Sequence, residues 1–409
     1  MFNKNKLQHI GLTLGSFLLV HLSAGTVLAG DWPHYRGPDR NGFTSTVDLQ
    51  TDWASQSPKK LWQAQVGVGF SSITVADGKA YTMGWVNDQD VVSCLDLKTG
   101  QTVWTHTYKA KKAPKMYDGG PNATPELSDG RVFTLGKQGQ VHCLDAQSGK
   151  VLWHVDLKQA GYKEPSWGFT GGPMVWKDTV YINAGESGVA LKAADGSFVW
   201  RSGNDKTAYA VPQPFEFRGQ PALAIMAKNT VEVVDPASGR VYWNYGWKTS
   251  WDVNAAEPVV VGQTMFLSSG YNKGGILLDF SGQEVREIWK SKGIKSQCSG
   301  AVLIDGHLYG LSGDVKKNVE LVCMNYQTGQ VVWEQKGFHV GAVVGADGHL
   351  LVLDGKGTLV LVEATPAGYR EKGRLNILNG TCWTPPALAH GKLLARNSDG
   401  NLVCYQVGS

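Results

Sequence analysis

After residue 30 the sequence has no long apolar run and little net charge. The whole chain carries 39 Lys and Arg against 35 Asp and Glu. Two of the lysines, Lys4 and Lys6, precede residue 30, which leaves 37 basic against 35 acidic side chains. A nearly neutral chain gives no reason to expect nucleic acid as a partner. The apolar run at residues 10–20 is too short to predict a transmembrane segment.

Several catalytic and cofactor motifs are also missing. The sequence contains no H-E-x-x-H, no G-x-S-x-G and no Walker loop, so a hydrolase has little support. It contains no C-x-x-C-H haem site and no adjacent pair of cysteines. No long linker and no low-complexity tract interrupts the chain, which predicts a single domain over residues 59–409.

The first 29 residues are typical of a secretory signal. Lys4 and Lys6 form a basic start, residues 10–20 form an apolar core, and the small-residue sequence VLA precedes Gly30. We therefore expect cleavage after about Ala29. No cysteine lies near that point, which argues against a lipid anchor. The mature chain is expected to be a soluble monomer, periplasmic or secreted.

One pattern of thirteen residues occurs three times. VSCLDLKTGQTVW covers residues 92–104, VHCLDAQSGKVLW covers 141–153, and LVCMNYQTGQVVW covers 321–333. Each copy has alternating apolar residues, then Asp or Asn followed four positions later by Gly, and ends in Trp. Asx and Gly at this spacing close a turn, so each copy predicts a β-hairpin. Including weaker copies, tryptophans occur at 62, 104, 153, 200, 243, 289 and 333. This period predicts a propeller.

A second hairpin precedes each of these hairpins, which gives four strands per repeat, here named A to D from the axis outward. Eight A strands can be counted, and the last repeat has only three strands. The segment KKLWQAQV, from Lys59, carries a D-strand tryptophan before the first A strand. We therefore predict an all-β, eight-bladed propeller of four-stranded antiparallel blades. The N-terminal strand completes the last blade, and residues 30–58 form an extension that packs on the propeller.

The cysteines follow the same repeat. Cys94, Cys143, Cys323 and Cys404 occupy one C-strand position in different blades. Equivalent positions in separate blades are too far apart for a disulfide. These four cysteines are expected to be buried apolar residues.

The pattern "small residue, x, Asp, x, x, Thr/Ser, Gly, x, x, x, Trp" resembles the repeat of the pyrroloquinoline quinone (PQQ) propellers. Residues 94–104 and 143–153 match it best, and DWPHYRGPDRNG, from Asp31, resembles the opening of exported PQQ-like repeat proteins. The resemblance implies that the repeat tryptophans pack between neighbouring blades.

Two branches of that family differ in function. Quinoprotein alcohol dehydrogenases bind PQQ and Ca²⁺ on the axis, whereas the periplasmic scaffold of the outer-membrane barrel-assembly machine has the same propeller and no cofactor. The favoured interpretation is a non-catalytic binding or scaffold protein without a cofactor. The alternative is a PQQ- and calcium-dependent dehydrogenase that oxidises an alcohol or a sugar.

Strand order predicts which face carries the function. The D-to-A and B-to-C loops share one face, the top, and the A-to-B and C-to-D turns share the bottom. The D-to-A loops are long, varied and rich in lysine and aromatic residues, and such loops often carry function. A protein or peptide partner, or a small anionic or aromatic ligand, is expected there. Alternatively, the lysines are solvated and the aromatic residues only fill the funnel. The candidate residues of this top funnel are Asn122, Thr170, Asn254, Lys115, Trp167, Trp251 and Trp383.

Two groups in these loops have metal-ligand chemistry. Asp252, Asn254 and Glu257 offer oxygen ligands for calcium, and Asp252 and Glu257 would be the catalytic carboxylates of a dehydrogenase. Alternatively, the Asx residues cap the loop and Glu257 pairs with a lysine. Cys298, His339 and Cys382 come from adjacent blades and could hold a soft metal, although their alignment is also expected by chance.

Overall fold

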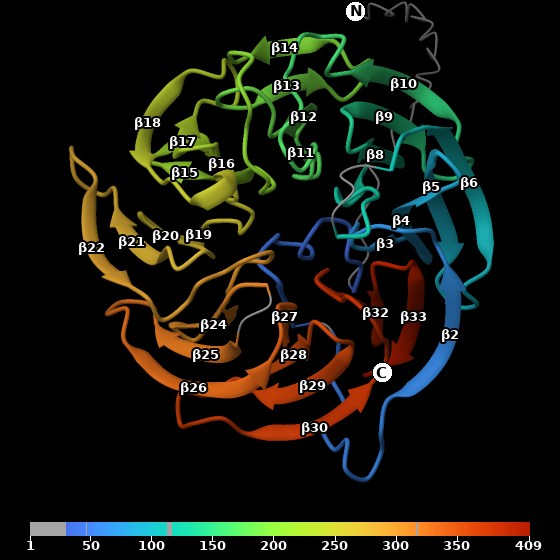
Figure 1. Cartoon of the computed structure of the whole chain (residues 1–409), viewed down its shortest axis with the longest axis vertical. Coiled ribbons are helices and arrows are strands. Elements are labelled where there is room, and N and C mark those ends of the chain that lie inside the picture. The colour runs from blue at the N-terminus through green and yellow to red at the C-terminus, as the bar shows by residue number, and fades with distance from the viewer. Residues whose placement is uncertain (1–29, 46, 113–116, 316–317) are drawn as a thin grey trace, which may run out of the picture.

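The computed structural model describes residues 30–409 except 46, 113–116 and 316–317. The described chain forms an all-β, eight-bladed propeller (Figure 1). Within this part of the chain the one helical element is a short 3-10 turn, η1 (Ser250–Asp252). The predicted fold class is confirmed. The predicted signal sequence and Lys115 lie outside the described residues.

Each blade is a four-stranded antiparallel sheet. The strands of blades 1 to 4, each in the order A to D, are β3 (Thr74–Ala76), β4 (Lys79–Val86), β5 (Gln89–Asp96) and β6 (Thr102–Lys109); β7 (Glu126–Ser128), β8 (Arg131–Leu135), β9 (Gln140–Asp145) and β10 (Val151–Asp156); β11 (Met174–Trp176), β12 (Thr179–Ile182), β13 (Val189–Lys192) and β14 (Phe198–Arg201); and β15 (Gln213–Phe217), β16 (Gln220–Met226), β17 (Thr230–Val234) and β18 (Val241–Gly246).

Blades 5 to 8 follow the same order, except that the last D strand comes from the start of the chain. Their strands are β19 (Val259–Val261), β20 (Thr264–Ser269), β21 (Gly274–Asp279) and β22 (Arg286–Ser291); β23 (Val302–Ile304), β24 (His307–Ser312), β25 (Val319–Asn325) and β26 (Val331–Phe338); β27 (Ala342–Ala346), β28 (His349–Leu353), β29 (Thr358–Glu363) and β30 (Glu371–Asn376); and β31 (Ala387–Ala389), β32 (Lys392–Arg396), β33 (Asn401–Gln406) and β2 (Lys59–Gln65).

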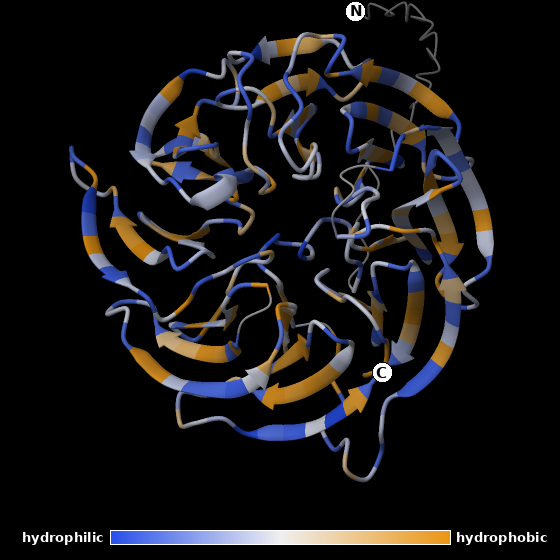
Figure 2. Cartoon of the chain, in the orientation of Figure 1, coloured by the Kyte–Doolittle hydropathy of each residue, from blue (hydrophilic) through white to orange (hydrophobic). Residues whose placement is uncertain are grey.

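The N-terminal strand β2 closes the ring, as the sequence predicted. It pairs antiparallel with β33, from Lys59 opposite Gln406 to Gln65 opposite Asn401. Closure removes two unprotected sheet edges, which otherwise invite aggregation. The D strands form the outer rim and alternate polar with apolar residues, whereas the strands inside them are more uniformly apolar (Figure 2). This pattern is expected for a strand with one buried and one solvated face.

The repeated Trp and Gly meet at the interface between blades. The indole N–H of Trp104, on β6 of blade 1, donates to the carbonyl of Ala146 in blade 2, 3.1 Å away. The ring also packs on Gly149, whose φ is 70° and where an added Cβ would lie 2.5 Å from the ring. The turn glycine is therefore required twice, for its left-handed backbone and for its missing side chain. Corresponding indole-to-carbonyl bonds are made by Trp62, Trp153, Trp200, Trp289 and Trp333.

Trp243 is the exception among the seven repeat tryptophans. Among the residues that the structure describes, its indole N–H has no hydrogen-bond partner. Arg218 takes over the role at this interface, because its Nε donates to the carbonyl of Phe280 in blade 5, 3.1 Å away. The rings of Phe217 and Phe280 pack beside it, with centroids 5.2 Å apart.

Residues 31–44 lie inside the central channel, where they appear in blue in the middle of the ring (Figure 1). The backbone of Trp32 pairs with Val75 on β3. Further along, β1 (Phe43–Thr44) pairs parallel with β27 and becomes the fifth strand of blade 7. These residues thus form backbone hydrogen bonds with the inner edges of A strands. Without them, the backbone N–H and C=O groups at those edges would have no partner in the sheet.

Both ends of this channel segment lie at the bottom face. At one end the carbonyl of Gly30 accepts from the N–H of His390, in the A-to-B turn of blade 8. At the other end the N–H of Leu49 donates to Asp347, in the A-to-B turn of blade 7. The segment therefore enters from below and returns below. We call residues 31–44 the axial segment.

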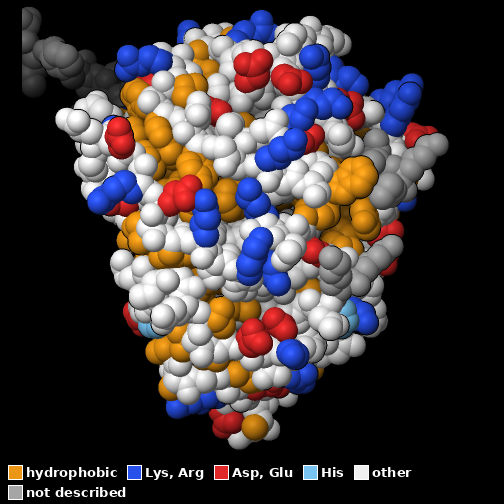
Figure 3. Space-filling view, turned by 60° about the vertical axis from the view of Figure 1, so that its left-hand side comes forward, with side chains coloured by type: hydrophobic (Ala, Val, Ile, Leu, Met, Phe, Trp, Pro, Cys, Tyr) orange, Lys and Arg blue, Asp and Glu red, His pale blue; other side chains and the backbone are white. Residues whose placement is uncertain are grey.

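The described surface has mixed charge. Lysine and arginine side chains are interspersed with aspartate and glutamate on the side shown in Figure 3. No helix within the described residues is long and apolar enough to cross a membrane. All six cysteines are free, and Cys94, Cys143, Cys323 and Cys404 are buried in the blades, as expected.

Candidate ligand-binding pocket on the propeller axis

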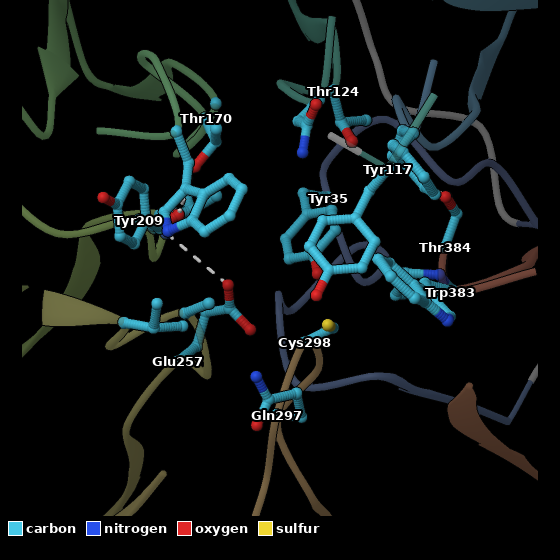
Figure 4. Close-up of a pocket in the computed structure, with 18 of the residues that line it drawn as sticks. Tyr35, Tyr117, Thr124, Thr170, Tyr209, Glu257, Gln297, Cys298, Trp383 and Thr384 are labelled. Carbon is cyan, nitrogen blue, oxygen red and sulfur yellow. Dashed lines mark hydrogen bonds between the residues drawn. The ribbon is translucent and has the colours of Figure 1, made fainter. Parts of the chain in front are cut away.

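A pocket opens on the axis at the top face. Its volume is about 1070 Å³, including solvent at the open mouth. D-to-A loops from several blades form the walls, and Tyr35 of the axial segment lies at the centre (Figure 4). The aromatic lining consists of Tyr35, Phe70, Tyr117, Trp167, Tyr209, Tyr271 and Trp383.

Several residues that the repeat alignment placed at the funnel do line this pocket. Asn122 and Trp383 come from loops entering blades 2 and 8, and Thr170 and Trp167 come from the loop entering blade 3. Glu257 and Cys298 also line it. The structure thus brings together residues that are far apart in sequence.

Other candidates lie elsewhere. Asn254 is fully buried, and its amide donates to the carbonyls of Ala227, Lys228 and Trp247 at 3.0 to 3.3 Å. Its role is to hold the loop together. Trp251 is 74% exposed and Asp252 pairs with Lys228 at 3.8 Å, and neither residue lines the pocket.

A buried ion pair lies at the base of the pocket. Arg36 Nη1 is 3.5 Å from Glu257 Oε2, and the two side chains are 2% and 3% exposed. Arg36 Nη2 also donates to the carbonyl of Ala301, 2.8 Å away. Burial raises the pKa of Glu257, and the Arg36 guanidinium opposes this rise. Burial likewise raises the pKa of Tyr35 beside this pair.

A buried lysine lines the wall between blades 1 and 2. Lys137 is 6% exposed, and burial lowers its pKa to about 7. The nearby Asp90 has its pKa raised by burial to about 7. Both shifts favour the uncharged forms of the two side chains.

The three residues with oxygen ligands do not fit a calcium site. Calcium takes six to eight oxygen ligands arranged around one point. The Oδ1 of Asn254 accepts from the hydroxyls of Thr249 and Ser269, while Asp252 lies with Lys228 away from the pocket. Glu257 alone faces the pocket, and its neighbour is a guanidinium.

The three candidates for a soft metal are also separated. Cys298 lines the axial pocket, whereas His339 borders a second hollow and its Nδ1 lies 3.1 Å from Asp354. Cys382 is buried, and burial raises the pKa of its thiol to about 12. Within the described residues no three His, Cys, Asp or Glu side chains form a group that could hold a metal.

Sequence reasoning missed Tyr35, Arg36 and Lys137. The first two lie in DWPHYRGPDRNG, which belongs to no repeat copy, so the repeat pattern gives this stretch no position in the fold. Lys137 follows β8 in a B-to-C loop. The B-to-C loops are predicted to lie on the top face, so the position of Lys137 in such a loop is the sequence signal that indicates it.

Comparisons with known proteins identify the family. A family model described as outer membrane protein assembly factor BamB matches residues 87–335. BamB of Yersinia pestis is 21% identical over 357 residues, which cover 82% of this chain and 86% of that protein. The quinohemoprotein alcohol dehydrogenase ADH-IIG of Pseudomonas putida is 27% identical over 315 residues, 72% of this chain. The match covers 37% of that dehydrogenase.

Solved structures show the same fold. BamB from Moraxella catarrhalis superposes with a TM-score of 0.64 at 16% identity, covering 85% of this chain and 99% of that one. Quinohemoprotein alcohol dehydrogenase from Comamonas testosteroni superposes with a TM-score of 0.70 at 14% identity, covering 93% and 81%. Because the family model matches more than half of the residues, the chain belongs to the family described as outer membrane protein assembly factor BamB.

Proposed function

We propose that the chain is an exported, non-catalytic binding or scaffold propeller that works through its top-face loops. Its setting would be periplasmic or secreted. One observation carries the proposal. Of the described residues that line the axial pocket, Glu257 is the one carboxylate, and Arg36 of the axial segment is already paired with it. The similarity to BamB over most of both chains supports the same interpretation.

The alternative, a PQQ- and calcium-dependent dehydrogenase acting on an alcohol or a sugar, is favoured by the likeness to quinohemoprotein alcohol dehydrogenases. An alcohol dehydrogenase needs a carboxylate that is free to accept the proton of the alcohol. Glu257 is held by a buried guanidinium, and proton uptake there would break an ion pair. The need for a free carboxylate therefore favours the non-catalytic function over the dehydrogenase.

The test is to mix the purified mature protein with PQQ and Ca²⁺ and to measure binding by calorimetry and dye reduction with a panel of alcohols and aldoses. We expect no substrate-dependent dye reduction. Dye reduction that is lost in Glu257→Gln and kept in Asp252→Asn would establish a dehydrogenase, because only the first carboxylate lines the pocket. Tight PQQ binding without turnover would agree with a binding protein.

A further inference from the structure

Lys137 is a buried lysine whose amino group has no partner. The residue follows β8 in the B-to-C loop of blade 2, lines the axial pocket and is 6% exposed. Among the described residues, its Nζ has neither a hydrogen bond nor an ion pair. Asn122 Oδ1 and Trp167 Nε1 are fully enclosed, whereas Lys137 Nζ keeps accessible surface. Because the residue lines the pocket, this nitrogen is open to a molecule bound there.

The loop that enters blade 3 holds the stem of this lysine in place. The N–H of Phe169 donates to the carbonyl of Lys137, 2.9 Å away. Gly168 has a φ of 78°, and a Cβ added there would lie 2.3 Å from Lys137 Cγ. The loop thus packs directly on the lysine side chain, which requires a glycine at this position. A reactive group that is fixed in this way is already oriented for a bound molecule.

The surroundings of Lys137 favour a neutral amine. Burial lowers the pKa of Lys137 to about 7, and the carboxylates of Asp90 and Glu164 oppose that change. At pH 7 about half of the chains then carry a neutral amine, against roughly one in 2,500 for an ordinary lysine with a pKa of about 10.4. A desolvated neutral lysine is a nucleophile toward carbonyl carbon.

The space beside the lysine suits an uncharged aromatic molecule. Trp167 directly precedes the glycine that packs on the lysine stem, and its ring centroid lies 5.7 Å from that of Tyr117 with the planes 46° apart. A single aromatic ring can pack against either ring by its face or its edge. Of the described residues that line the pocket, Glu257 is the one carboxylate, and Arg36 is already paired with it. Lys137 is therefore the lining group that is left for a polar end of the ligand.

We propose that the axial pocket binds a small aromatic aldehyde covalently and reversibly, as an imine on Lys137 Nζ. The neutral amine attacks the carbonyl carbon and forms a C–N bond, and the carbonyl oxygen leaves as water with the two amine protons. No electrons are transferred, so the step needs no oxidant, and hydrolysis reverses it. The inference rests on the binding function proposed above and names the ligand class of its pocket.

The first experiment traps the imine on the unaltered mature protein. Benzaldehyde is added at pH 7 with cyanoborohydride, which reduces an imine to a stable secondary amine, and peptide mapping by mass spectrometry locates the label. Lys150, exposed in the C-to-D turn of the same blade, is the internal control. Lys137 should be labelled at least ten times faster than Lys150. Labelling of Lys137 at or below the rate of Lys150 would overturn the proposal.

Competitors test whether the pocket selects an aromatic aldehyde. Excess benzamide is flat and uncharged but forms no imine, so it should slow labelling of Lys137 at least fivefold and leave Lys150 unchanged. Butanal has no ring, so its ratio of labelling at Lys137 to that at Lys150 should be at least five times lower than that of benzaldehyde. An equal ratio would contradict the aromatic class. Benzoate that protects Lys137 better than benzamide would show a cation that binds carboxylates, and would overturn the imine site.

Two glycines of one loop provide matched variants. Gly168→Ala should press on the lysine stem and slow labelling of Lys137 at least fivefold. Gly161→Ala also places alanine at a positive φ, 95°, but its Cβ meets no atom within 4 Å, so it should change the rate less than twofold. Thermal unfolding checks that both variants are folded. Equal labelling in the two variants would contradict the packing of the loop on the lysine.

A lysine variant separates the nucleophile from its charge. Lys137→Arg keeps a cation but cannot form an imine, and calorimetry without the hydride should show benzaldehyde binding at least tenfold more weakly than in the parent. Lys150→Arg is the control and should change the Kd less than twofold. Unchanged binding in Lys137→Arg would overturn the covalent site.

The outcomes separate this inference from the function on which it rests. Failure of labelling at Lys137, together with no PQQ-dependent turnover, overturns the imine site alone. Labelling at Lys137 accompanied by PQQ-dependent oxidation of an alcohol or a sugar supports the site and overturns the non-catalytic function.

Discussion

Arg36 and Glu257 form an ion pair across the propeller axis, with Nη1 and Oε2 3.5 Å apart and both side chains almost completely buried. The pair joins the axial segment to the loop that enters blade 5. Arg36→Met should therefore lower the free energy of unfolding by about 3–5 kcal/mol, because it leaves a buried carboxylate unpaired. Urea denaturation measures this. The double variant Arg36→Met with Glu257→Gln should recover at least half of the loss, and a double variant as unstable as the single one would contradict the pairing.

The interface between blades predicts a difference between two glycines of blade 2. Gly149→Ala and Gly130→Ala both place alanine at a φ near 70°, so the backbone strain is common to both. An added Cβ meets Trp104 at position 149 and no atom within 4 Å at position 130. Gly149→Ala should be less stable than Gly130→Ala by about 1–3 kcal/mol, from overpacking. Equal midpoints in urea would show that the ring does not press on the turn.

The tryptophans predict a second contrast. Trp62 bonds the carbonyl of Leu97 at 2.9 Å and links blade 8 to blade 1. Trp62→Phe should lower stability by about 1–3 kcal/mol, because a buried carbonyl loses its donor. Trp243→Phe should cost less, because Arg218 supplies the bond at that interface. Denaturation of the two variants in parallel decides this, and the reverse order would be inconsistent with the structure.

A cluster of histidines predicts a pH dependence. His142 packs between Tyr108 and His154, with ring centroids 4.4 Å away in each case, and burial lowers its pKa to about 3. The unfolded chain, with an ordinary pKa of about 6.5, binds a proton there that the folded chain does not. The contribution of His142 to the free energy of unfolding should thus be fully present above about pH 6.5. As the pH decreases from there toward 3, the free energy of unfolding should fall by up to about 1.4 kcal/mol per pH unit.

The variant His142→Gln tests this dependence. Denaturation midpoints at pH 7.5, 6.0 and 5.0 should fall less steeply in the variant than in the parent. His307→Gln replaces a histidine outside the cluster and should keep the steep dependence. Parallel curves for His142→Gln and the parent would exclude the cluster as the source.

The mature N-terminus is the fifth prediction. Mass spectrometry of the protein from its native host should find a mature chain starting near Gly30, with the first 29 residues removed. An intact Met1 in the cytoplasm would contradict export.

The repeat made the fold predictable from sequence. Trp104 and Gly149 recur at fixed spacing, because each blade solves the same packing problem, and the alignment of the copies also placed Asn122, Thr170 and Trp383 at the axis. The same alignment could not predict that Asn254 lies outside the pocket. Its amide donates to three carbonyls next to the left-handed turn at Trp251.

The axial segment could not be placed from sequence for a different reason. Tyr35 and Arg36 belong to no repeat, so neither period nor alignment assigns them a neighbour. Their contacts are formed only when the ring has brought distant loops to the axis, as the bond from Arg36 to Ala301 illustrates. Residues outside a repeat can thus complete a site that the repeat alone leaves open.

The axial segment has a further consequence for the timing of binding. Since Tyr35 and Arg36 fill the channel beneath the pocket, a molecule in the pocket must enter and leave by the same mouth. A partner that settles on the top loops would then trap a ligand that is already inside and exclude one that arrives later. Occupancy of the two sites would follow a fixed order, and the lifetime of the inner complex would be set by how long the outer partner stays.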